Sequence, residues 1–359
     1  MLSLELFSLG EVIHGSKKEK EVLKILQKKF GGSLLEVKTK EWVHELEVYV
    51  NGEKINATLL PYTSGEVEGI VGKDIKLYQM PPHPFQVKDL YEESVKKGYK
   101  AVIFYDYGKL RRISVGNKIP AIFSEKPVRE GDKVEIIANS SLVDTTSYNL
   151  EVIISEGEDY IIIGAHVDHW LTGYHDNLFS LDVIDGLRKV KLNKHGLKFV
   201  FFSSEEGPRC CTGSSQYKKD DTFVMISLDA LFPKKVVFSA TPDLYSFSKF
   251  FNVKRIEMPT PFSDHFPFVT EGYPAMVLYN DDLIPFYHSN KDLPIEEDKE
   301  YLNELVNSLT RFLIELDKYS REQLDEIFIN YAKAQGFEIK ERRGSIVASG
   351  LTSTFKKSQ

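Results

Sequence analysis

Four short apolar runs, separated by helical segments, constrain this chain more than any other feature of its sequence. They are IIIG at 161–164, LKFVFF at 197–202, FVMISL at 223–228 and MVLY at 276–279. Continuous apolar strands are typical of a parallel sheet that is covered on both faces. The helical periodicity of residues 178–190, between the first two runs, fits a βαβ pattern. We therefore predict an α/β fold with a mostly parallel central sheet flanked by helices.

Composition and charge exclude several classes of protein. The chain has 359 residues, of which 42% are apolar and 28% are charged, as expected for a folded globular protein. No stretch approaches the ~18 apolar residues of a membrane helix, and residues 1–21 lack the features of a secretory signal. We therefore expect a cytoplasmic protein with no membrane partner. The net charge of -7 argues against nucleic acid as the main partner.

The pattern of the sequence changes between residues 51 and 140. Short β-like runs alternate there with turns, around one helix expected near residues 87–98. We predict that 51–140 form a smaller β-rich domain, inserted into a larger domain made of residues 1–50 and 141–336. The last residues, 337–359, are expected to form a loose tail.

Local signals predict further elements before the insert. Residues 10–30 have the spacing of an amphipathic helix. Two strands are expected at 34–37 and 42–50, the second closed by an Asn51-Gly52 turn.

The C-terminal part of the chain predicts two helices. The first has one apolar face through residues 302–316. The second begins at a capping box of Ser320 and Gln323 and stops at Gly336. We expect these helices to cover the core or to form an oligomer face, so the sequence leaves a homo-oligomer open.

Side chains that can bind metal follow the four apolar runs. They are His166, Asp168, Asp176, Glu205, Glu206, Asp229 and His288. In an open α/β sheet, reactive groups collect beyond the carboxyl ends of the strands. Each of these residues alone would be a packed histidine, a cap or a solvated acid, but together they predict a metal site at one edge of the sheet.

The residue types suit zinc, since neutral imidazole and carboxylate oxygen are common zinc ligands. Asp168, two residues from His166, can accept the second ring N–H of that histidine and fix its orientation. The adjacent carboxylates of Glu205 and Glu206 repel each other unless cations lie nearby. One glutamate could then bind metal while the other takes a proton from water.

The motifs GAHVD, DN, EEG, LD, SDH and YHS occur in this order across residues 148–316. The ordered set resembles the zinc aminopeptidase and glutamate carboxypeptidase family of two-metal exopeptidases. The resemblance implies two zinc ions bridged by Asp176. One metal site would be completed by Glu206 and His288, and the other by His166 and Asp229. A site of this kind also accepts cobalt or manganese.

The resemblance also implies roles in catalysis. Glu205 would be the general base, which takes a proton from the attacking water and passes it to the leaving amine. Asp168 would be the hydrogen-bond partner of His166. Tyr287 and His265 stand where family members place groups near the substrate.

The expected function is a metal-dependent exopeptidase acting on peptides, with an aminopeptidase preferred. A carboxypeptidase or deacylase on the same scaffold is the alternative. Basic groups near the cleft would favour a substrate carboxylate, and Arg209 is the one close candidate in the sequence. A single-zinc glutaminyl cyclase relative fits less well, because five ligands are present. A non-catalytic peptide-binding relative would be expected to lack some of these ligands.

Other features follow from the same resemblance. The insert at 51–140, through GYKAVIFYDYG and IPAIF, is similar to the protease-associated domain, which covers the active site in several family members. The family's bridging aspartate precedes a cis peptide bond, which here would join Asp176 to Asn177. Residues 178–181 and 208–212 depart from the family pattern near the expected cleft, which leaves substrate preference open.

The chain has two cysteines, Cys210 and Cys211, which are adjacent. No disulfide framework is expected from such a pair. We predict a packed pair rather than a redox switch, because no further thiol is available as a partner.

Overall fold

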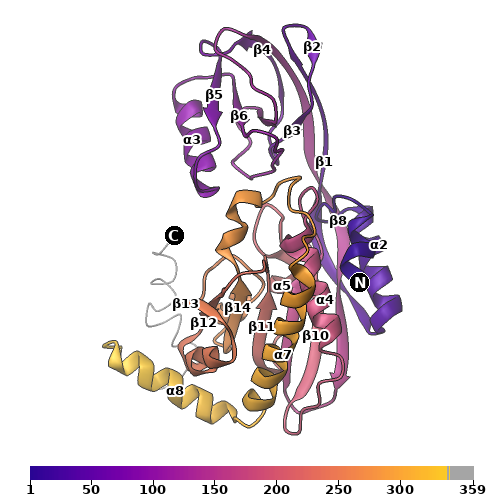
Figure 1. Cartoon of the computed structure of the whole chain (residues 1–359), viewed down its shortest axis with the longest axis vertical. Coiled ribbons are helices and arrows are strands. Elements are labelled where there is room, and N and C mark those ends of the chain that lie inside the picture. The colour runs from indigo at the N-terminus through magenta and orange to yellow at the C-terminus, as the bar shows by residue number, and fades with distance from the viewer. Residues whose placement is uncertain (338, 340–359) are drawn as a thin grey trace.

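The central sheet is built from the four apolar runs. The computed structural model describes residues 1–337 and 339. The parallel strands are β9 (Tyr160–His166), β10 (Gly196–Phe202), β11 (Thr222–Leu228) and β14 (Ala275–Tyr279). All side chains of β9, β10 and β11 are buried, because helices cover both faces of the sheet (Figure 1). The predicted α/β fold with a mostly parallel central sheet is confirmed.

Antiparallel strands extend this parallel core on both sides. The order is β13-β12-β14-β11-β9-β10-β8-β1-β2, with β4 paired to β8. β12 (Val236–Ala240) is antiparallel to β14 and parallel to β13 (Val253–Glu257), and β8 (Lys133–Ser155) is antiparallel to β10. β12 and β13 were not predicted. β13 lies at the sheet edge and is mostly charged (VKRIE), so its sequence gives only a weak strand signal.

Helices pack on the two faces of the sheet through alternating residues of β9. Ile161 and Ile163 share a core cluster with α1, α2, α4 and α7, whereas Ile162 packs with Phe268 of α6 and Phe328 of α8. The longer helices are α2 (Lys17–Phe30), α4 (Phe179–Gly186), α7 (Asp298–Leu316) and α8 (Arg321–Ala334). The shorter ones are α1 (Leu2–Phe7), η1 (Tyr174–Leu178), α5 (Thr212–Gln216), η2 (Pro242–Phe250), α6 (Phe266–Thr270) and η3 (Asp281–Phe286).

Among the described residues, no helix has both the length and the apolar character needed to cross a membrane.

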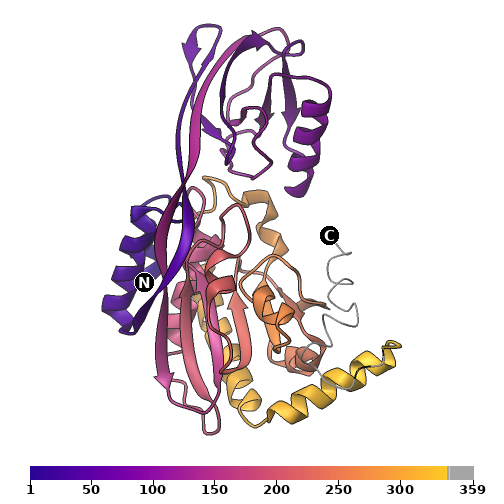
Figure 2. The same ribbon diagram turned by 180° about the vertical axis from the view of Figure 1, so that it is seen from behind.

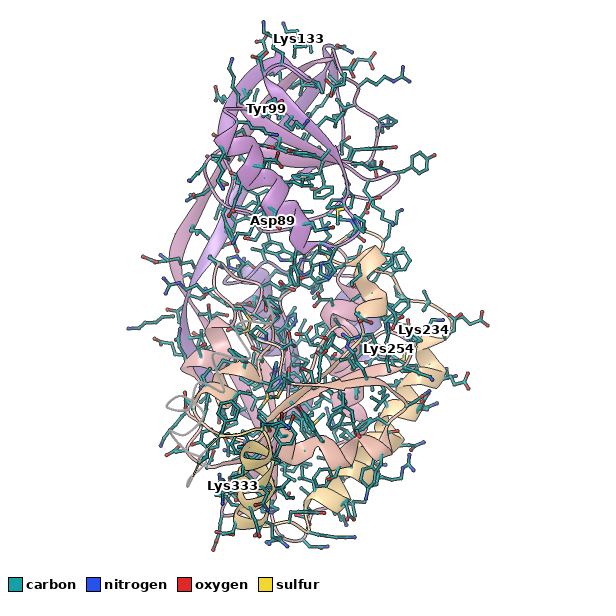
Figure 3. All side chains as sticks on the ribbon, turned by 90° about the vertical axis from the view of Figure 1, so that its left-hand side faces the viewer. Asp89, Tyr99, Lys133, Lys234, Lys254 and Lys333 are labelled. Carbon is teal, nitrogen blue, oxygen red and sulfur yellow. A yellow bond between two sulfur atoms is a disulfide. The ribbon has the colours of Figure 1, made fainter. Side chains whose placement is uncertain are left out.

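A second, smaller sheet forms the upper lobe of the molecule (Figures 1 and 2). Its strands, in order, are β3 (Ala57–Leu59), β7 (Ala121–Ser124), β6 (Ala101–Tyr105) and β5 (Ile75–Gln79). The lobe also contains α3 (Phe85–Lys96) and β4 (Gly65–Ile70). Figure 3 shows it from the side, with Asp89, Tyr99 and Lys133 on the lobe and Lys333 at the far end of the molecule.

A long two-stranded ribbon joins this lobe to the central sheet. β1 (Ser33–Val50) is one strand rather than the two predicted, and it pairs with β8 from Ser33↔Glu151 to Val50↔Val134. At its upper end β1 turns through Asn51 and Gly52 into β2 (Glu53–Lys54), the expected hairpin. β8 runs without a break through residues 140 and 141, where a domain boundary was expected, because the same strand serves both lobes.

The chain ends as the capping signals predict, up to the limit of the described residues. Ser320 and Gln323 form the expected capping box of α8. Of the expected tail, Phe337 and Ile339 are described and pack in the same core cluster as Ile162, Phe268 and Phe328, so the packed chain extends past residue 336. The rest of the tail lies outside the described residues.

Candidate active site

All five residues predicted as metal ligands meet at the carboxyl edge of the parallel strands. His166 is the last residue of β9, Asp229 directly follows β11, and Glu206 lies in the turn after β10. Asp176 comes from η1, and His288 follows η3. Because neighbouring parallel strands end at the same edge, side chains from distant parts of the chain are brought within a few ångströms.

Asp176 lies between the two histidines. Its Oδ1 is 3.3 Å from Nε2 of His166, and its Oδ2 is 3.2 Å from Nε2 of His288. Its backbone N–H donates to Oδ2 of Asp292 at 3.0 Å, and the peptide bond to Asn177 is cis, as the resemblance implies. The two carboxylate oxygens therefore face two separate groups of ligands.

Each histidine has its own acidic neighbours. Nε2 of His166 lies 3.4 Å from Oδ1 of Asp229 and 3.6 Å from Oε2 of Glu205. Nε2 of His288 lies 3.0 Å from Oε1 of Glu206. Two sets of ligand atoms result, and Asp176 contributes one oxygen to each.

Asp168 acts differently from the prediction. The ring Nδ1 of His166 lies 2.7 Å from the backbone carbonyl oxygen of Asp168, whereas the Asp168 carboxylate is 3.7 Å away. That carboxylate instead accepts the backbone N–H groups of Glu205 at 3.0 Å and of Glu206 at 2.9 Å. Asp168 thus orients the histidine through its backbone and holds both glutamates through its side chain.

Two arginines of the insert reach this site and were not predicted. The backbone carbonyl oxygen of Arg112 lies 3.1 Å from Nδ1 of His288. The side chain of Arg111 donates to the carbonyl oxygens of Tyr287 at 2.8 Å and Pro285 at 2.6 Å, and pairs with Asp106. Both arginines are buried. The predicted basic candidate, Arg209, is exposed on the surface.

Tyr287 and His265, both predicted near the substrate, occupy different environments. The Tyr287 ring stacks on His288 at 3.6 Å between centroids and stays partly exposed. Burial and the surrounding carboxylates, Glu206 foremost, raise the pKa of Tyr287 well above its usual value, so its hydroxyl stays protonated and can donate. His265 is completely buried, and that burial lowers its pKa to about 3. From this position His265 has no surface to offer a substrate.

The electrostatics of the cluster favour bound cations. Burial raises the pKa of Glu205 well above its usual range, and Glu206 and Asp229 add to the rise while His166 opposes it. Burial lowers the pKa of His288, but Glu206 and Asp176 outweigh this and raise it to about 10. So many buried carboxylates are costly unless positive charge lies among them.

The donor atoms also fit metal. Oδ1 of Asp176 is buried and, among the described residues, has no hydrogen-bond donor. His166, Asp176 and Glu206 offer ligand atoms that all lie within 4.8 Å of one another, and so do His166, Glu205 and Asp229. Imidazole nitrogen and carboxylate oxygen are the ligands that zinc takes in such sites.

Comparison with known proteins assigns the family. Residues 149–313 match the model of peptidase family M28, and this segment holds all five residues predicted as metal ligands. The chain therefore carries an M28 peptidase domain. No curated protein matches the chain by sequence.

Solved structures share the fold of most of this chain. BSAP, a zinc aminopeptidase from Bacillus subtilis, aligns over 90% of this chain and 97% of its own, at 15% identity and a TM-score of 0.65. An M28 peptidase precursor from Shewanella amazonensis SB2B aligns over 89% and 93%, at 14% identity and a TM-score of 0.67. An aminopeptidase from Aneurinibacillus sp. strain AM-1 aligns over 95% and 93%, at 19% identity and a TM-score of 0.54.

The two unusual segments of the M28 domain differ in exposure. Leu178, Phe179, Ser180 and Leu181 are all buried in the core, so they have no exposed surface for a substrate side chain, contrary to expectation. Residues 208–210 are exposed and lie close to Glu205 in the chain. Of these two segments, the second is therefore the one with exposed surface that a substrate could contact.

Proposed function

We propose that this M28 peptidase is an aminopeptidase that removes N-terminal residues from peptides with two bound zinc ions. The observation that carries the proposal is the position of Asp176, which directs one carboxylate oxygen toward each of two histidine-centred ligand sets. His166 and Asp229 would hold one ion, and Glu206 and His288 the other. The same donor set also accepts cobalt or manganese.

The bound metals would supply Lewis acidity toward the scissile carbonyl and toward water. The chain supplies the proton transfers. Glu205 lies beside the ligands without being needed to hold an ion, and its Oε2 faces His166 at 3.6 Å. Its backbone is fixed by Asp168. Glu205 would take the proton of the attacking water and deliver it to the leaving amine.

Tyr287 would assist as a hydrogen-bond donor. Its hydroxyl remains protonated because burial and the neighbouring carboxylates raise its pKa. Its ring is held on His288 and its backbone carbonyl is held by Arg111. A protonated phenol at this position can stabilise charge that develops on the carbonyl oxygen of the substrate.

The charge distribution favours a free amine over a carboxylate at the substrate terminus. The two arginines that approach the His288 loop are both committed to other partners: Arg111 to Asp106 and backbone carbonyls, and Arg112 to Glu11 and the carbonyl oxygen of Leu59. The ligand cluster itself is rich in carboxylates. A carboxypeptidase or deacylase would need a cation aimed at the substrate, which these arginines do not provide.

The insert would cover the site and take part in substrate choice, as a protease-associated domain does. Its segment 110–112 pairs backbone to backbone with 288–290. On another side, Phe85 of α3 meets Phe262 of the catalytic domain with ring centroids 5.1 Å apart, and both rings are about half exposed. These two contacts support an insert that is docked over the site.

The proposal is tested by hydrolysis of aminoacyl chromogenic substrates and of matched N-blocked peptides. Wild type should cleave the free-amine substrates and leave the blocked ones intact. Glu205→Gln keeps the size of the side chain but cannot accept the proton, so kcat should fall by ~10²–10⁴ with zinc content unchanged. Glu53→Gln, an exposed glutamate of the insert, is the matched control. Cleavage of blocked peptides alone would support the carboxypeptidase or deacylase alternative.

A further inference from the structure

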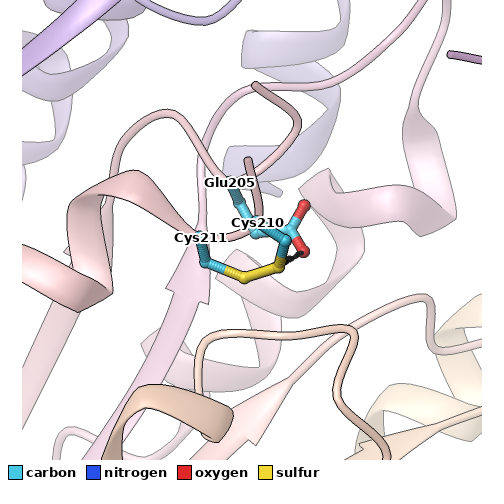
Figure 4. Close-up of side chains that lie close together, drawn as sticks. All are labelled: Glu205, Cys210 and Cys211. Atoms are coloured by element: carbon cyan, nitrogen blue, oxygen red, sulfur yellow. Dashed lines mark hydrogen bonds between the residues drawn. A yellow bond between two sulfur atoms is a disulfide. The ribbon is translucent and has the colours of Figure 1, made fainter. Parts of the chain in front are cut away.

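A disulfide joins the adjacent cysteines Cys210 and Cys211, contrary to the predicted packed pair of thiols. Cys211 is buried, whereas Cys210 is exposed to solvent. The pair lies in the turn between Glu206 and α5, five and six residues after the glutamate proposed as general base. Figure 4 shows the two sulfur atoms directly beside the carboxylate of Glu205.

The two oxygens of Glu205 face different partners. Oε2 lies 3.6 Å from Nε2 of His166, on the side of the metal ligands. Oε1 lies 3.5 Å from Sγ of Cys210 and 3.7 Å from Sγ of Cys211. The disulfide therefore forms the wall of the site behind the carboxylate, opposite the ligands.

Small molecules can reach the disulfide from a cavity. The cavity has a volume of about 260 Å³ and is lined by both cysteines, together with residues of α6 and of the chain on either side of it, among them Pro261, Phe266 and Glu271. Because both cysteines line this cavity and Cys210 is exposed, thiols in solution have a path to the sulfur atoms of the disulfide.

We propose that Cys210–Cys211 is a site of thiol–disulfide exchange that is coupled to Glu205. A small dithiol, or a dithiol protein, would be the reductant. A thiolate of the reductant attacks Sγ of Cys210 and forms a mixed disulfide with it. The S–S bond between Cys210 and Cys211 breaks, and Cys211 leaves as a thiolate that takes up a proton. The second thiol of the reductant then displaces Cys210, so the reductant becomes a disulfide and the chain gains two thiols. The effect on activity rests on the proposed peptidase function.

Reduction changes what Oε1 of Glu205 contacts. The disulfide has no hydrogen to donate, so it leaves this oxygen free of hydrogen bonds from sulfur. Two thiols at the same positions each carry an S–H group, and both can donate to Oε1. Hydrogen bonds to one oxygen would hold the carboxyl group in place and hinder its movement between the attacking water and the leaving amine. The reduced chain should therefore be the less active form.

The first measurement counts thiols under denaturing conditions, before and after the folded chain is treated with the small dithiol dithiothreitol, which is then removed. We expect no thiols before treatment and both cysteines as thiols after it. The kcat of the reduced chain should be lower by roughly tenfold, the size of effect of one hydrogen bond to a charged group, with unchanged zinc content. Reoxidation should restore it. Two thiols in the untreated chain, or equal kcat in both forms, would overturn the proposal.

A variant and a reagent separate this site from general effects of reduction. Cys210→Ala/Cys211→Ala should lose all response to dithiothreitol. Phenylarsine oxide, which binds paired thiols, should bind the wild type only after reduction and should not bind the variant. If the variant keeps the response, the proposal fails. If neither form cleaves any substrate, the proposed peptidase function fails instead, and the exchange site is still decided by the thiol count and by arsenical binding.

Discussion

Oδ1 of Asp168 accepts the backbone N–H of Glu205 at 3.0 Å, and the other oxygen of this buried carboxylate accepts the N–H of Glu206. One side chain thereby fixes the backbone of both the proposed base and a proposed ligand. Its own backbone carbonyl meanwhile orients His166. Asp168 is thus a positioning residue that links three groups of the site.

Substitution of Asp168 tests this role. Asp168→Asn keeps the shape but leaves one oxygen to accept two N–H groups, so one backbone donor is left facing an amide NH₂. We expect kcat to fall about tenfold with KM little changed, and the free energy of unfolding to fall by about 2 kcal/mol. Enzyme kinetics and urea unfolding measure both. The exposed Asp220→Asn is the control, and an unchanged kcat in Asp168→Asn would argue against a positioning role.

The insert should support catalysis through Arg111. Arg111→Met keeps the length and apolar stem but removes the hydrogen bonds to the carbonyl oxygens of Tyr287 and Pro285. The loop that carries Tyr287 and His288 should become less ordered, and kcat/KM should fall by about tenfold. Steady-state kinetics with the exposed Arg129→Met as control decide this. Equal kcat/KM in the two variants would show that the hydrogen bonds of Arg111 to this loop are not needed for catalysis.

Stability should depend on pH through His175. Its Nδ1 and Nε2 donate to Asp292 at 2.7 Å and Asp298 at 2.6 Å. Burial lowers the pKa of His175, but these carboxylates outweigh it and raise the pKa to about 9. The folded chain therefore binds more protons than the unfolded chain between about pH 6.5 and 9.

The resulting stabilisation is fully present below about pH 6.5 and is lost as pH rises through 9. It amounts to at most ~3 kcal/mol. Urea unfolding across this range, with a chelator present so that metal does not contribute, should show the decline. In His175→Gln the decline should be smaller by the contribution of His175, and the remainder should come from His288 and His166, whose pKa values are also raised. A decline of equal size in both proteins would assign it to other groups.

The fold and the convergence of the strand-end candidate ligands could be predicted because both depend on local pattern. Each buried strand is a continuous apolar run, and the polar residue that ends it must lie at the sheet edge. Asp176 and His288 lie in loops beyond the strand ends, and their roles were implied by the family resemblance. The strand β1 was predicted in two pieces, since residues 38–41 are polar and charged, and only pairing with β8 keeps them extended.

The remaining features depend on contacts between distant segments. Arg111 and Arg112 look like a solvated basic pair in the sequence, and only docking of the insert brings them to a loop about 175 residues away. Spacing could not tell whether Asp168 meets His166 through its side chain or its carbonyl. The burial of His265 likewise follows from packing of the loop before α6.

The number of zinc ions per chain tests the central claim most directly. Elemental analysis of the purified chain, loaded with zinc and dialysed, should give about two ions per chain. Asp176→Ala should hold fewer than one, because it removes an oxygen from both ligand sets, while the exposed Asp220→Ala should match wild type. One ion or none in the loaded wild type, or two ions in Asp176→Ala, would contradict a two-metal site bridged by Asp176.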